Sequence, residues 1–509
     1  MKSRTEHITR NVFFSLVTQV LLLLFAFISR TIFIRLLGSE YLGLDGLFTS
    51  ILTIFSLAEL GIGNAIIFSL YKPIANADTF KAQQLLSLYK QAYKWISIAI
   101  AIIGILLIPF LPRIINADID HLGINIYVVY ILFLLNTLSS YFLAHRQAIL
   151  VVNQEQSIVS VCQLYVKLLV YVLEVLVLLV YNSYYGFLII KVAGNYLSAV
   201  YINHKAKIRY PKLCKANNYK LSSFEIRSIK KDVYALFLRR FGGVILSATD
   251  NIIINKFISL TMVGIYSNYI LIQTSIQTIT TQVMSSMTAS IGNFVATQGK
   301  SNTEKAFNLY NYITYLVYGF CSISFILLAN RFITLLWGDN YVLSKGTLYL
   351  IVFNFFLYGY QTALNTFRDT AGLFTQGKYR SLVSASFNLV FSLLLVRPLG
   401  VSGVVIGTIL SRILVSSWYD SFILYKHLFK KSFAPYIKKL ILYILIVFLN
   451  ASILDWITTF IPDNIAGFIL CIIVSLLSVG LLIIPLQMCE ESKDFFSRMN
   501  NIVHNLIYK

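Results

Sequence analysis

Residues 30–70 read RTIFIRLLGSEYLGLDGLFTSILTIFSLAELGIGNAIIFSL, and this stretch decides the fold class of the chain. It is almost wholly apolar, yet it carries Arg30, Arg35, Asp45 and Glu59. An ionised side chain in the bilayer interior costs about 2.5–3.5 kcal/mol on insertion scales, so such residues normally face a helix bundle or a wet cavity. The stretch therefore predicts membrane helices that enclose a polar path.

A helix break is expected directly after Glu59, where the sequence continues Leu-Gly-Ile-Gly-Asn over 60–64. Two glycines loosen a helix here in mid-membrane, and exposed backbone at that depth is tolerated only where protein or a water-filled cavity satisfies it. One interpretation is a cavity beside Glu59. The other is a packing contact softened by glycine, with Glu59 hydrogen-bonded and neutral.

The composition is that of a polytopic membrane protein, because 57% of the 509 residues are hydrophobic and only 12% are charged. The formal net charge of +21 comes from basic residues in short loops, which is the positive-inside signal and not a sign of nucleic-acid binding. The five cysteines show no CxxC spacing, so neither a disulfide framework nor a thiolate metal site is expected. The apolar run 12–37 is too long for a cleavable signal peptide.

Taking about 20 apolar residues as one span, we expect an all-α fold of about fourteen transmembrane helices. They lie near 12–37, 42–70, 92–111, 123–144, 158–181, 185–203, 233–258, 263–292, 309–336, 346–367, 381–397, 401–424, 440–460 and 465–487. Lys and Arg gather in alternate loops, among them 204–232 and 368–380. Both termini and the loop 204–232 are therefore assigned to the cytoplasm.

An internal repeat is indicated by a shift of 221 residues, which also aligns the order of spans and loops. The matched pairs are Arg35 with Lys256, Gly43 with Gly264, Leu88-Tyr89 with Leu309-Tyr310, Gly186 with Gly407 and Lys191 with Arg412. Parallel repeats place the substrate path between two lobes. We expect an N-lobe (1–203), a basic connecting loop (204–232), a C-lobe (233–430), and two further helices with a tail (431–509).

Four motifs carry a family likeness: FIRLLGSEYLGLDGLF (33–48), AELGIGNAI (58–66), LLWGDNY (335–341) and RPLGVSGVVIGTILS (397–411). Their order and spacing resemble the polysaccharide flippases of the Wzx type, within the multidrug/oligosaccharidyl-lipid/polysaccharide (MOP) exporter superfamily. The resemblance implies two six-helix lobes around a central cavity. It also implies a flippase for O-antigen, capsule or teichoic-type repeat units linked to undecaprenyl pyrophosphate. These units would move from the cytoplasmic to the outer leaflet of a bacterial cytoplasmic membrane by alternating access.

An anionic head group calls for cations inside the membrane, and depth along each span selects the candidates. The expected pyrophosphate ligands are Arg30, Arg412, Lys167, Lys191, Arg239 and Arg240. Arg412 and Arg30 lead, because arginine forms bidentate contacts with phosphate. The alternative for Arg239 and Arg240 is that they anchor the cytoplasmic end of their helix.

The short carboxylates Glu59, Glu174 and Asp250 cannot snorkel far and are the expected coupling sites for a proton or a sodium ion. The alternative is a structural ion pair, for example between Lys167 and Glu174 seven residues apart on one helix face. We expect no metal site and no cofactor beyond the coupling ion. Expected partners are membrane lipids and the glycan polymerase and glycosyltransferases of the same pathway.

Other functions were weighed against transport of polysaccharide units. A peptidoglycan-precursor flippase or a drug exporter of the same superfamily fits the same residues. An integral-membrane glycan polymerase or acyltransferase is the rival from another class, but we expect none of the six histidines to pair with an acid, and the predicted external loops are short. The segment GNFVATQGKS (292–301) has six residues between its glycines instead of four and follows no strand, so a nucleotide site is excluded. The chain is expected not to be an enzyme.

Overall fold

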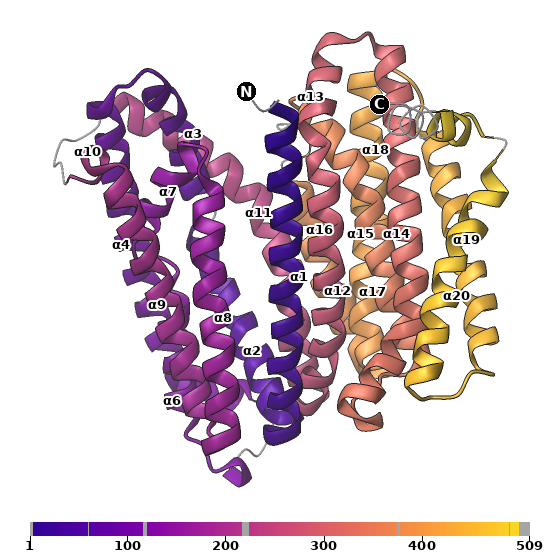
Figure 1. Ribbon diagram of the computed structural model, residues 1–509, viewed down its shortest axis with the longest axis horizontal. Coiled ribbons are helices and arrows are strands. Elements are labelled where there is room, and N and C mark those ends of the chain that lie inside the picture. Colours follow the sequence, from indigo (N-terminus) through magenta and orange to yellow (C-terminus); the bar gives the residue numbers. More distant parts are fainter. Residues whose placement is uncertain are drawn as a thin grey trace. The chain divides into compact units, whose positions relative to one another are not determined.

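The computed structural model describes residues 4–59, 61–115, 120–215, 223–373, 377, 379–487 and 489–497 (Figure 1). Its elements are helices joined by short turns, so the predicted all-α class is confirmed. The chain divides into two compact units, Met1–Ser267 and Asn268–Lys509.

The first unit holds the helices up to the start of α12. They are α1 (Arg4–Leu37), α2 (Ser39–Phe55), η1 (Ser56–Glu59), α3 (Ile62–Ala75), α4 (Thr79–Leu107), α5 (Leu111–Ile114), α6 (Ile126–Ser139), α7 (Ala144–Val152), α8 (Gln156–Tyr181), α9 (Tyr184–Arg209), α10 (Pro211–Cys214) and α11 (Ser223–Phe257). Helix α12 (Leu260–Ser286) begins in this unit.

The second unit holds the rest of α12 and the helices that follow. They are α13 (Thr288–Thr297), α14 (Lys300–Trp337), α15 (Lys345–Thr370), α16 (Arg380–Leu399), α17 (Val401–Ser411), α18 (Trp418–Leu424), α19 (Ala434–Thr458) and α20 (Ile465–Ile483). Two π-helical segments, η5 (Arg412–Ser417) and η6 (Tyr425–Phe429), flank α18.

Every predicted span overlaps helix, although a turn at 140–143 divides the span 123–144 and a turn at 287 divides the span 263–292. The chain is a multi-pass membrane protein. Within the described part, ten helices are long and apolar enough to cross a membrane. The predicted spans outside this set lie on α2–α3, α11, α12 and α15. The first is interrupted by a break, α12 is rich in Thr, Ser and Gln, and α15 is largely buried and carries polar side chains.

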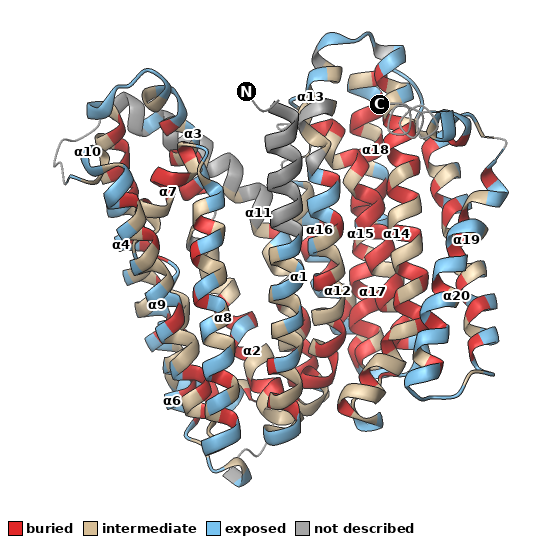
Figure 2. Cartoon of the chain, in the orientation of Figure 1, coloured by how far each residue is buried: buried red, intermediate tan, exposed pale blue. Residues whose placement is uncertain are grey.

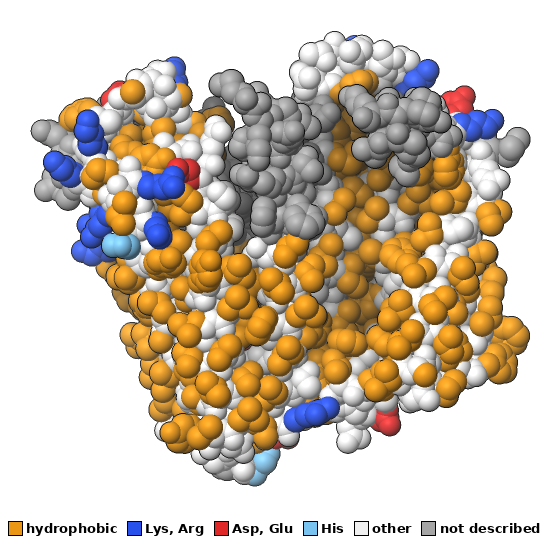
Figure 3. Space-filling view, viewed as in Figure 1, with side chains coloured by type: hydrophobic (Ala, Val, Ile, Leu, Met, Phe, Trp, Pro, Cys, Tyr) orange, Lys and Arg blue, Asp and Glu red, His pale blue; other side chains and the backbone are white. Residues whose placement is uncertain are grey.

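Burial is densest in the second unit, along α14, α15 and α17 (Figure 2). Large aromatic side chains fill this core, and α19 and α20 pack on α14. Tyr315 of α14 stacks on Tyr443 of α19 with 4.0 Å between ring centroids. The two helices outside the repeat therefore belong to the core of this unit. On the outer flanks, hydrophobic side chains face outward between the charged helix ends (Figure 3), as expected for contact with lipid.

The helix bounds follow the predicted repeat. The first residues of α2 and α12, Ser39 and Leu260, are 221 positions apart, as are the first residues of α4 and α14, Thr79 and Lys300. Helix α11 nevertheless packs on α2 and α3, where Asn251 Nδ2 donates to Ser50 Oγ at 2.9 Å. This packing puts α11 in the first unit, although the repeat assigns it to the second copy. The lobes 1–203 and 233–430 are defined by the repeat and stay a prediction.

Helices α2 and α12 cross backbone to backbone at two repeat-equivalent glycines. A Cβ on Gly43 would lie 2.1 Å from the carbonyl oxygen of Leu260, and a Cβ on Gly264 would lie 2.2 Å from that of Ser39. Ser39 and Leu260 are equivalent in the repeat, so the contact is reciprocal, like an isologous contact around a two-fold axis. Neither position has room for a side chain.

Candidate functional site

The break after Glu59 is present as predicted. Helix α2 ends at Phe55, the tight segment η1 follows, and Gly61 has φ +92°, a left-handed conformation that favours glycine. Helix α3 then restarts at Ile62. The glycine therefore lets the chain leave one helix axis and begin another beside Glu59.

Tyrosines surround the Glu59 carboxylate. Tyr93 donates a hydrogen bond to Glu59 Oε1 at 2.5 Å, and Tyr141 also bonds to this carboxyl. Tyr89 stacks on Tyr93 with 4.4 Å between centroids. A Cβ on Gly63 would lie 2.4 Å from the Tyr93 hydroxyl oxygen, so a glycine at this position lets α3 approach Tyr93 closely. Glu59 is hydrogen-bonded in the first unit, and its coupling role stays a prediction.

A second polar site in the first unit joins charged residues from four helices. This unit-1 cluster consists of Arg30 on α1, Asp45 on α2, Glu174 on α8 and Lys191 on α9. Lys191 Nζ lies 3.0 Å from Asp45 Oδ1. The structure thus brings together three residues predicted as site residues, Arg30, Glu174 and Lys191.

Serines complete the unit-1 cluster. Ser29 Oγ donates to Glu174 Oε2 at 3.2 Å, and Arg30 Nη2 donates to Ser267 Oγ at 2.7 Å. Glu174 is only 4% exposed. Its interaction with Ser29 replaces the Lys167–Glu174 pair that the sequence offered as an alternative, and Lys167 lies exposed on α8.

The charges of the unit-1 cluster balance when both carboxylates are ionised. Asp45 and Lys191 both interact electrostatically with Glu174, and Asp45 interacts with Arg30. Lys191 Nζ also lies 5.5 Å and 5.8 Å from the ring centroids of Phe133 and Phe187, within cation–π range. A proton taken up by Glu174 would leave the cluster with one net positive charge. The net charge of the cluster therefore depends on the protonation of Glu174.

The second unit carries a polar site around Arg412, at the start of the π-helical segment η5. Arg412 Nε donates to Asn354 Oδ1 at 2.7 Å, and Nη1 donates to Gln361 Oε1 at 3.4 Å. The guanidinium carbon lies 5.2 Å from the ring centroid of Tyr358. These three α15 residues share one helix face, since they are four and seven positions apart. All three are neutral, and we call this group the Arg412 site.

The two sites are equivalent in the repeat. Lys191 and Arg412 are 221 positions apart, and so are Phe133 and Asn354, the residues that each cation contacts. Each cation thus joins the same pair of helices in its own copy, α9 to α6 and α17–η5 to α15. Helical π-segments concentrate at functional sites, and η5 begins at this arginine.

A buried ion group in the second unit was missed at the sequence level. Asp420 on α18 is 1% exposed, and its Oδ1 lies 2.6 Å from Arg368 Nη1, while Arg380 pairs with its other oxygen. The sequence interpretation placed both arginines in a basic loop, but α15 continues to Thr370 and α16 starts at Arg380. The available signal was Asp420 itself, an acid inside the predicted span 401–424.

The remaining predicted residues are placed as follows. Asp250 on α11 is buried, and Tyr266 donates to its Oδ2 at 3.3 Å. Arg239 and Arg240 lie in α11, and their side chains fall outside the described residues. No group of three or more His, Cys, Asp or Glu that could hold a metal ion occurs among the residues described.

Comparison with known proteins gives matches among solved structures alone: no family profile and no curated protein matches the chain. An inward-facing multidrug resistance MATE family transporter of the MOP superfamily aligns with TM-score 0.63 and 14% identity, over 82% of this chain and 99% of its own. The lipid II flippase MurJ in an inward closed conformation aligns with TM-score 0.63 and 15% identity, over 93% and 97%. A Vibrio cholerae MATE transporter, VcmN in the bent form, aligns with TM-score 0.53 and 13% identity, over 83% and 98%.

The fold is that of the MOP superfamily. The likeness extends over nearly the whole length of each matched transporter, and it agrees with the superfamily that the motifs resemble. At 13–15% identity it establishes the MOP fold alone. The solved MOP structures are described as carrying different substrates, so the substrate of this chain has to be argued from its own residues.

Proposed function

We propose that this protein is a flippase that moves a lipid-linked oligosaccharide across the bacterial cytoplasmic membrane by alternating access. The proposed substrate is a glycan repeat unit on undecaprenyl pyrophosphate, moved from the cytoplasmic to the outer leaflet. The observation that supports it most is the Arg412 site, where Asn354, Gln361 and the ring of Tyr358 position a guanidinium within a MOP fold.

The chemistry of the head group explains the need for such a site. A saccharide on a pyrophosphate carries many hydroxyls and at least two negative charges, and unpaired polar groups each cost about 4–8 kcal/mol in hydrocarbon. A guanidinium offers two parallel N–H bonds to phosphate, and bonds of this kind are about twice as strong as neutral ones. Asn354 and Gln361 accept hydrogen bonds from Arg412 and orient its guanidinium, which we propose contacts the pyrophosphate.

The unit-1 cluster supports ion coupling in this proposal. Glu174 is a buried carboxyl that interacts with one cation, Lys191, and a second carboxyl, Asp45, so its proton occupancy decides the net charge of the cluster. A proton or sodium gradient acting at Glu174, Glu59 or Asp250 would then bias the transport cycle. Arg30 and Lys191 of the same cluster are the proposed secondary contacts of the pyrophosphate.

A peptidoglycan-precursor flippase is the second candidate. The match to the lipid II flippase includes 93% of this chain, against 82% for the inward-facing MATE transporter. This substrate is also a lipid-linked saccharide, so the cationic Arg412 site serves both candidates. The same site argues against cationic drugs, which it would repel.

The deciding experiment is reconstitution of the purified chain in vesicles that contain a fluorescent lipid-linked oligosaccharide or, separately, fluorescent lipid II. Leaflet accessibility is followed under an imposed proton or sodium gradient without ATP. We expect gradient-dependent flipping of the oligosaccharide lipid that is lost in Arg412→Ala and kept in Arg397→Ala, an exposed arginine on α16. Flipping of lipid II alone would select the second candidate, and flipping of neither by folded protein would reject both.

A further inference from the structure

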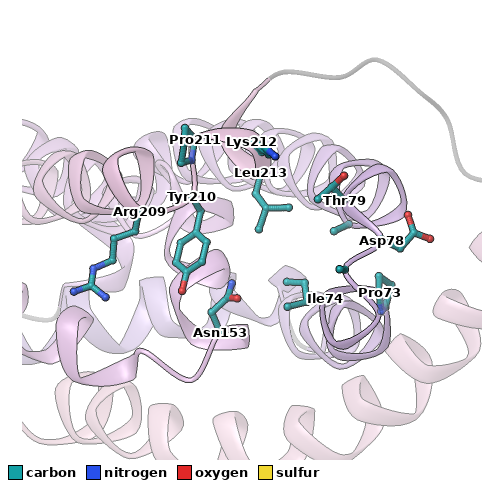
Figure 4. A pocket seen from close by; sticks show the side chains of 12 residues that line it. Pro73, Ile74, Asp78, Thr79, Asn153, Arg209, Tyr210, Pro211, Lys212 and Leu213 are labelled. Atoms are coloured by element: carbon teal, nitrogen blue, oxygen red, sulfur yellow. The ribbon is translucent and has the colours of Figure 1, made fainter.

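A cavity of about 370 Å³ lies in the first unit, where three turns between helices meet (Figure 4). The turns join α3 to α4, α7 to α8, and α9 to α10. All three are at the end of the helices that the Lys and Arg distribution predicts to be cytoplasmic. Lys191 of the unit-1 cluster is 18 residues before Arg209 on α9, which is about 27 Å at 1.5 Å per residue. The cavity is therefore separate from the sites described above.

The walls of this cavity are mainly apolar. Pro73, Ile74, Leu213 and the ring of Tyr210 line it, together with Ala82, which is fully buried. Leu213 and Ile74 point into the opening, whereas Arg209 and Asp78 point away from it (Figure 4). The interior thus suits a hydrocarbon segment better than a polar group.

The cavity is preformed, because hydrogen bonds hold α10 against two other helices. Gln83 Nε2 of α4 donates to the carbonyl oxygen of Lys212 at 2.7 Å. Arg146 Nη1 of α7 donates to the carbonyl oxygen of Cys214 at 2.9 Å. These side chains fix the wall that carries Leu213.

The cations Arg209 and Lys212 and the acid Asp78 line the cavity, and further cations lie close to it in the sequence. Residues 201–215 contain no Asp or Glu. They contain five cations, Lys205, Lys207, Arg209, Lys212 and Lys215. Lys and Arg gather at this end of the first unit (Figure 3), and Arg209 pairs with Glu155. Because the cations begin in the last turn of the membrane-spanning helix α9, they lie where lipid head groups are expected.

We propose that this cavity binds an anionic glycerophospholipid. Part of an acyl chain lies against Ile74, Ala82 and Leu213, and the phosphate lies at the rim near Lys212. An apolar slot beside a cluster of cations at the membrane surface is complementary to both parts of such a lipid. The lipid would tie together the ends of α3–α4, α7–α8 and α9–α10.

Native mass spectrometry of the detergent-purified full chain tests this lipid site, with phosphatidylglycerol and phosphatidylcholine as probes. We expect retention of phosphatidylglycerol, loss of it in Ala82→Phe, which fills the cavity, and affinity about fivefold weaker in Lys212→Gln. Lys94→Gln, which removes an exposed cation further along α4, is the matched control and should bind as the wild type does. Unchanged phosphatidylglycerol binding in both cavity variants would overturn the proposal.

A labelling assay keeps the proposal testable if Ala82→Phe does not fold. Thr79 is exposed on the rim, so Thr79→Cys, in a background without the five native cysteines, can be modified by a bulky thiol reagent. Phosphatidylglycerol should slow this modification. Equal protection by phosphatidylcholine would show that the anionic head group is irrelevant, equal protection by soluble glycerol phosphate would show a free phosphate site, and no protection would show no lipid. Each of these results contradicts the lipid proposal.

Discussion

Lys191 and Arg412 occupy the same position in the two copies of the repeat, yet their surroundings have opposite electrostatic characters. Lys191 is paired with Asp45 inside a cluster whose charges balance. Arg412 is held by Asn354, Gln361 and Tyr358, all of them neutral. The same helical framework therefore places a carboxylate beside the cation in the first copy and neutral hydrogen-bond partners beside the cation in the second.

The repeat shows how this difference arises. The positions equivalent to Asp45 and Glu174 are Tyr266 and Leu395. The second copy thus lacks both carboxylates that balance the first. In the proposed flippase, Arg412 would bind the anionic head group and the unit-1 cluster would respond to the ion gradient. The predictions below test that division of roles.

The largest expected effect follows from removing the positive charge of Arg412. Arg412→Ala should weaken binding of the lipid-linked oligosaccharide by about 1.5–3 kcal/mol, because a charge-assisted contact is lost. Arg412→Lys should restore binding only in part, since it lacks the planar fork. Binding to purified protein and the amount of folded protein in the membrane are measured together.

Arg30→Ala is the companion variant in the unit-1 cluster, and it should weaken binding of the lipid-linked oligosaccharide less than Arg412→Ala does. Cells that carry Arg412→Ala should accumulate lipid-linked units on the cytoplasmic leaflet. Normal binding by well-folded alanine variants at both positions would show that neither arginine binds the pyrophosphate. Lys167, Arg239 and Arg240 would then become the candidate ligands.

Asp45→Asn should make the unit-1 cluster resemble the Arg412 site, at the expense of stability. It leaves Lys191 without its carboxylate in a half-buried position, and we expect a loss of about 1–2 kcal/mol in the free energy of unfolding, less than for a fully buried pair. Asp45→Asn combined with Lys191→Gln should recover most of this loss. Unfolding curves of the two single variants and the double variant in detergent measure the coupling. Additive losses would mean that the pair contributes nothing.

Glu174→Gln should change the ion dependence of transport more than stability. The amide oxygen can still accept the hydrogen bond from Ser29, so we expect a loss of less than about 1 kcal/mol in unfolding free energy. The variant cannot be ionised, so the cluster keeps one net positive charge and transport should lose its dependence on the proton or sodium gradient.

The matched control for Glu174→Gln is Glu40→Gln, which changes a carboxyl in the first turn of α2 that pairs with His121. Glu59→Gln and Asp250→Asn test the other two carboxyls in the same assay. Unchanged gradient dependence in all three variants would reject these residues as coupling sites.

The smallest effect is expected for Lys191→Arg. The substitution keeps the positive charge, and arginine can still pair with Asp45 at this position, so stability should change by about 0.5 kcal/mol or less. Transport should remain near that of the wild type. A large loss of transport in Lys191→Arg would mean that the first copy also has strict geometric requirements. The proposed difference in role between Lys191 and Arg412 would then be wrong.

Much of the fold follows from local features of the sequence. Apolar runs mark most spans, and the glycines after Glu59 predict the break that separates α2 from α3. The repeat is visible because helix starts such as Ser39 and Leu260 keep their spacing. These features are local or periodic, so the sequence is sufficient to find them.

The partners within the sites depend on helix packing and could not be predicted. Asp45 and Lys191 are 146 positions apart, and Ser29 and Glu174 are 145 apart. Spacing on one helix suggested Lys167 for Glu174, but α1 packs on α8 and supplies Ser29 instead. Helix periodicity cannot tell which neighbouring helix provides a partner.

The buried Asp420 shows a different limit. Sequence hydropathy ends a span where charges begin, so Arg368 was assigned to a loop. The helix continues because Asp420 compensates the charge of Arg368. Apolarity alone cannot reveal a span whose charged end is neutralised by a residue 52 positions away.

The reciprocal crossing of Gly43 and Gly264 has a consequence for sequence divergence. It is the contact that two identical six-helix chains would make as a symmetric dimer, and in such a dimer any substitution changes both halves at once. Asp45 could not then be a carboxylate in one half and a tyrosine in the other. A single chain that contains both copies is free of this restriction, and the different charges around Lys191 and Arg412 require that freedom.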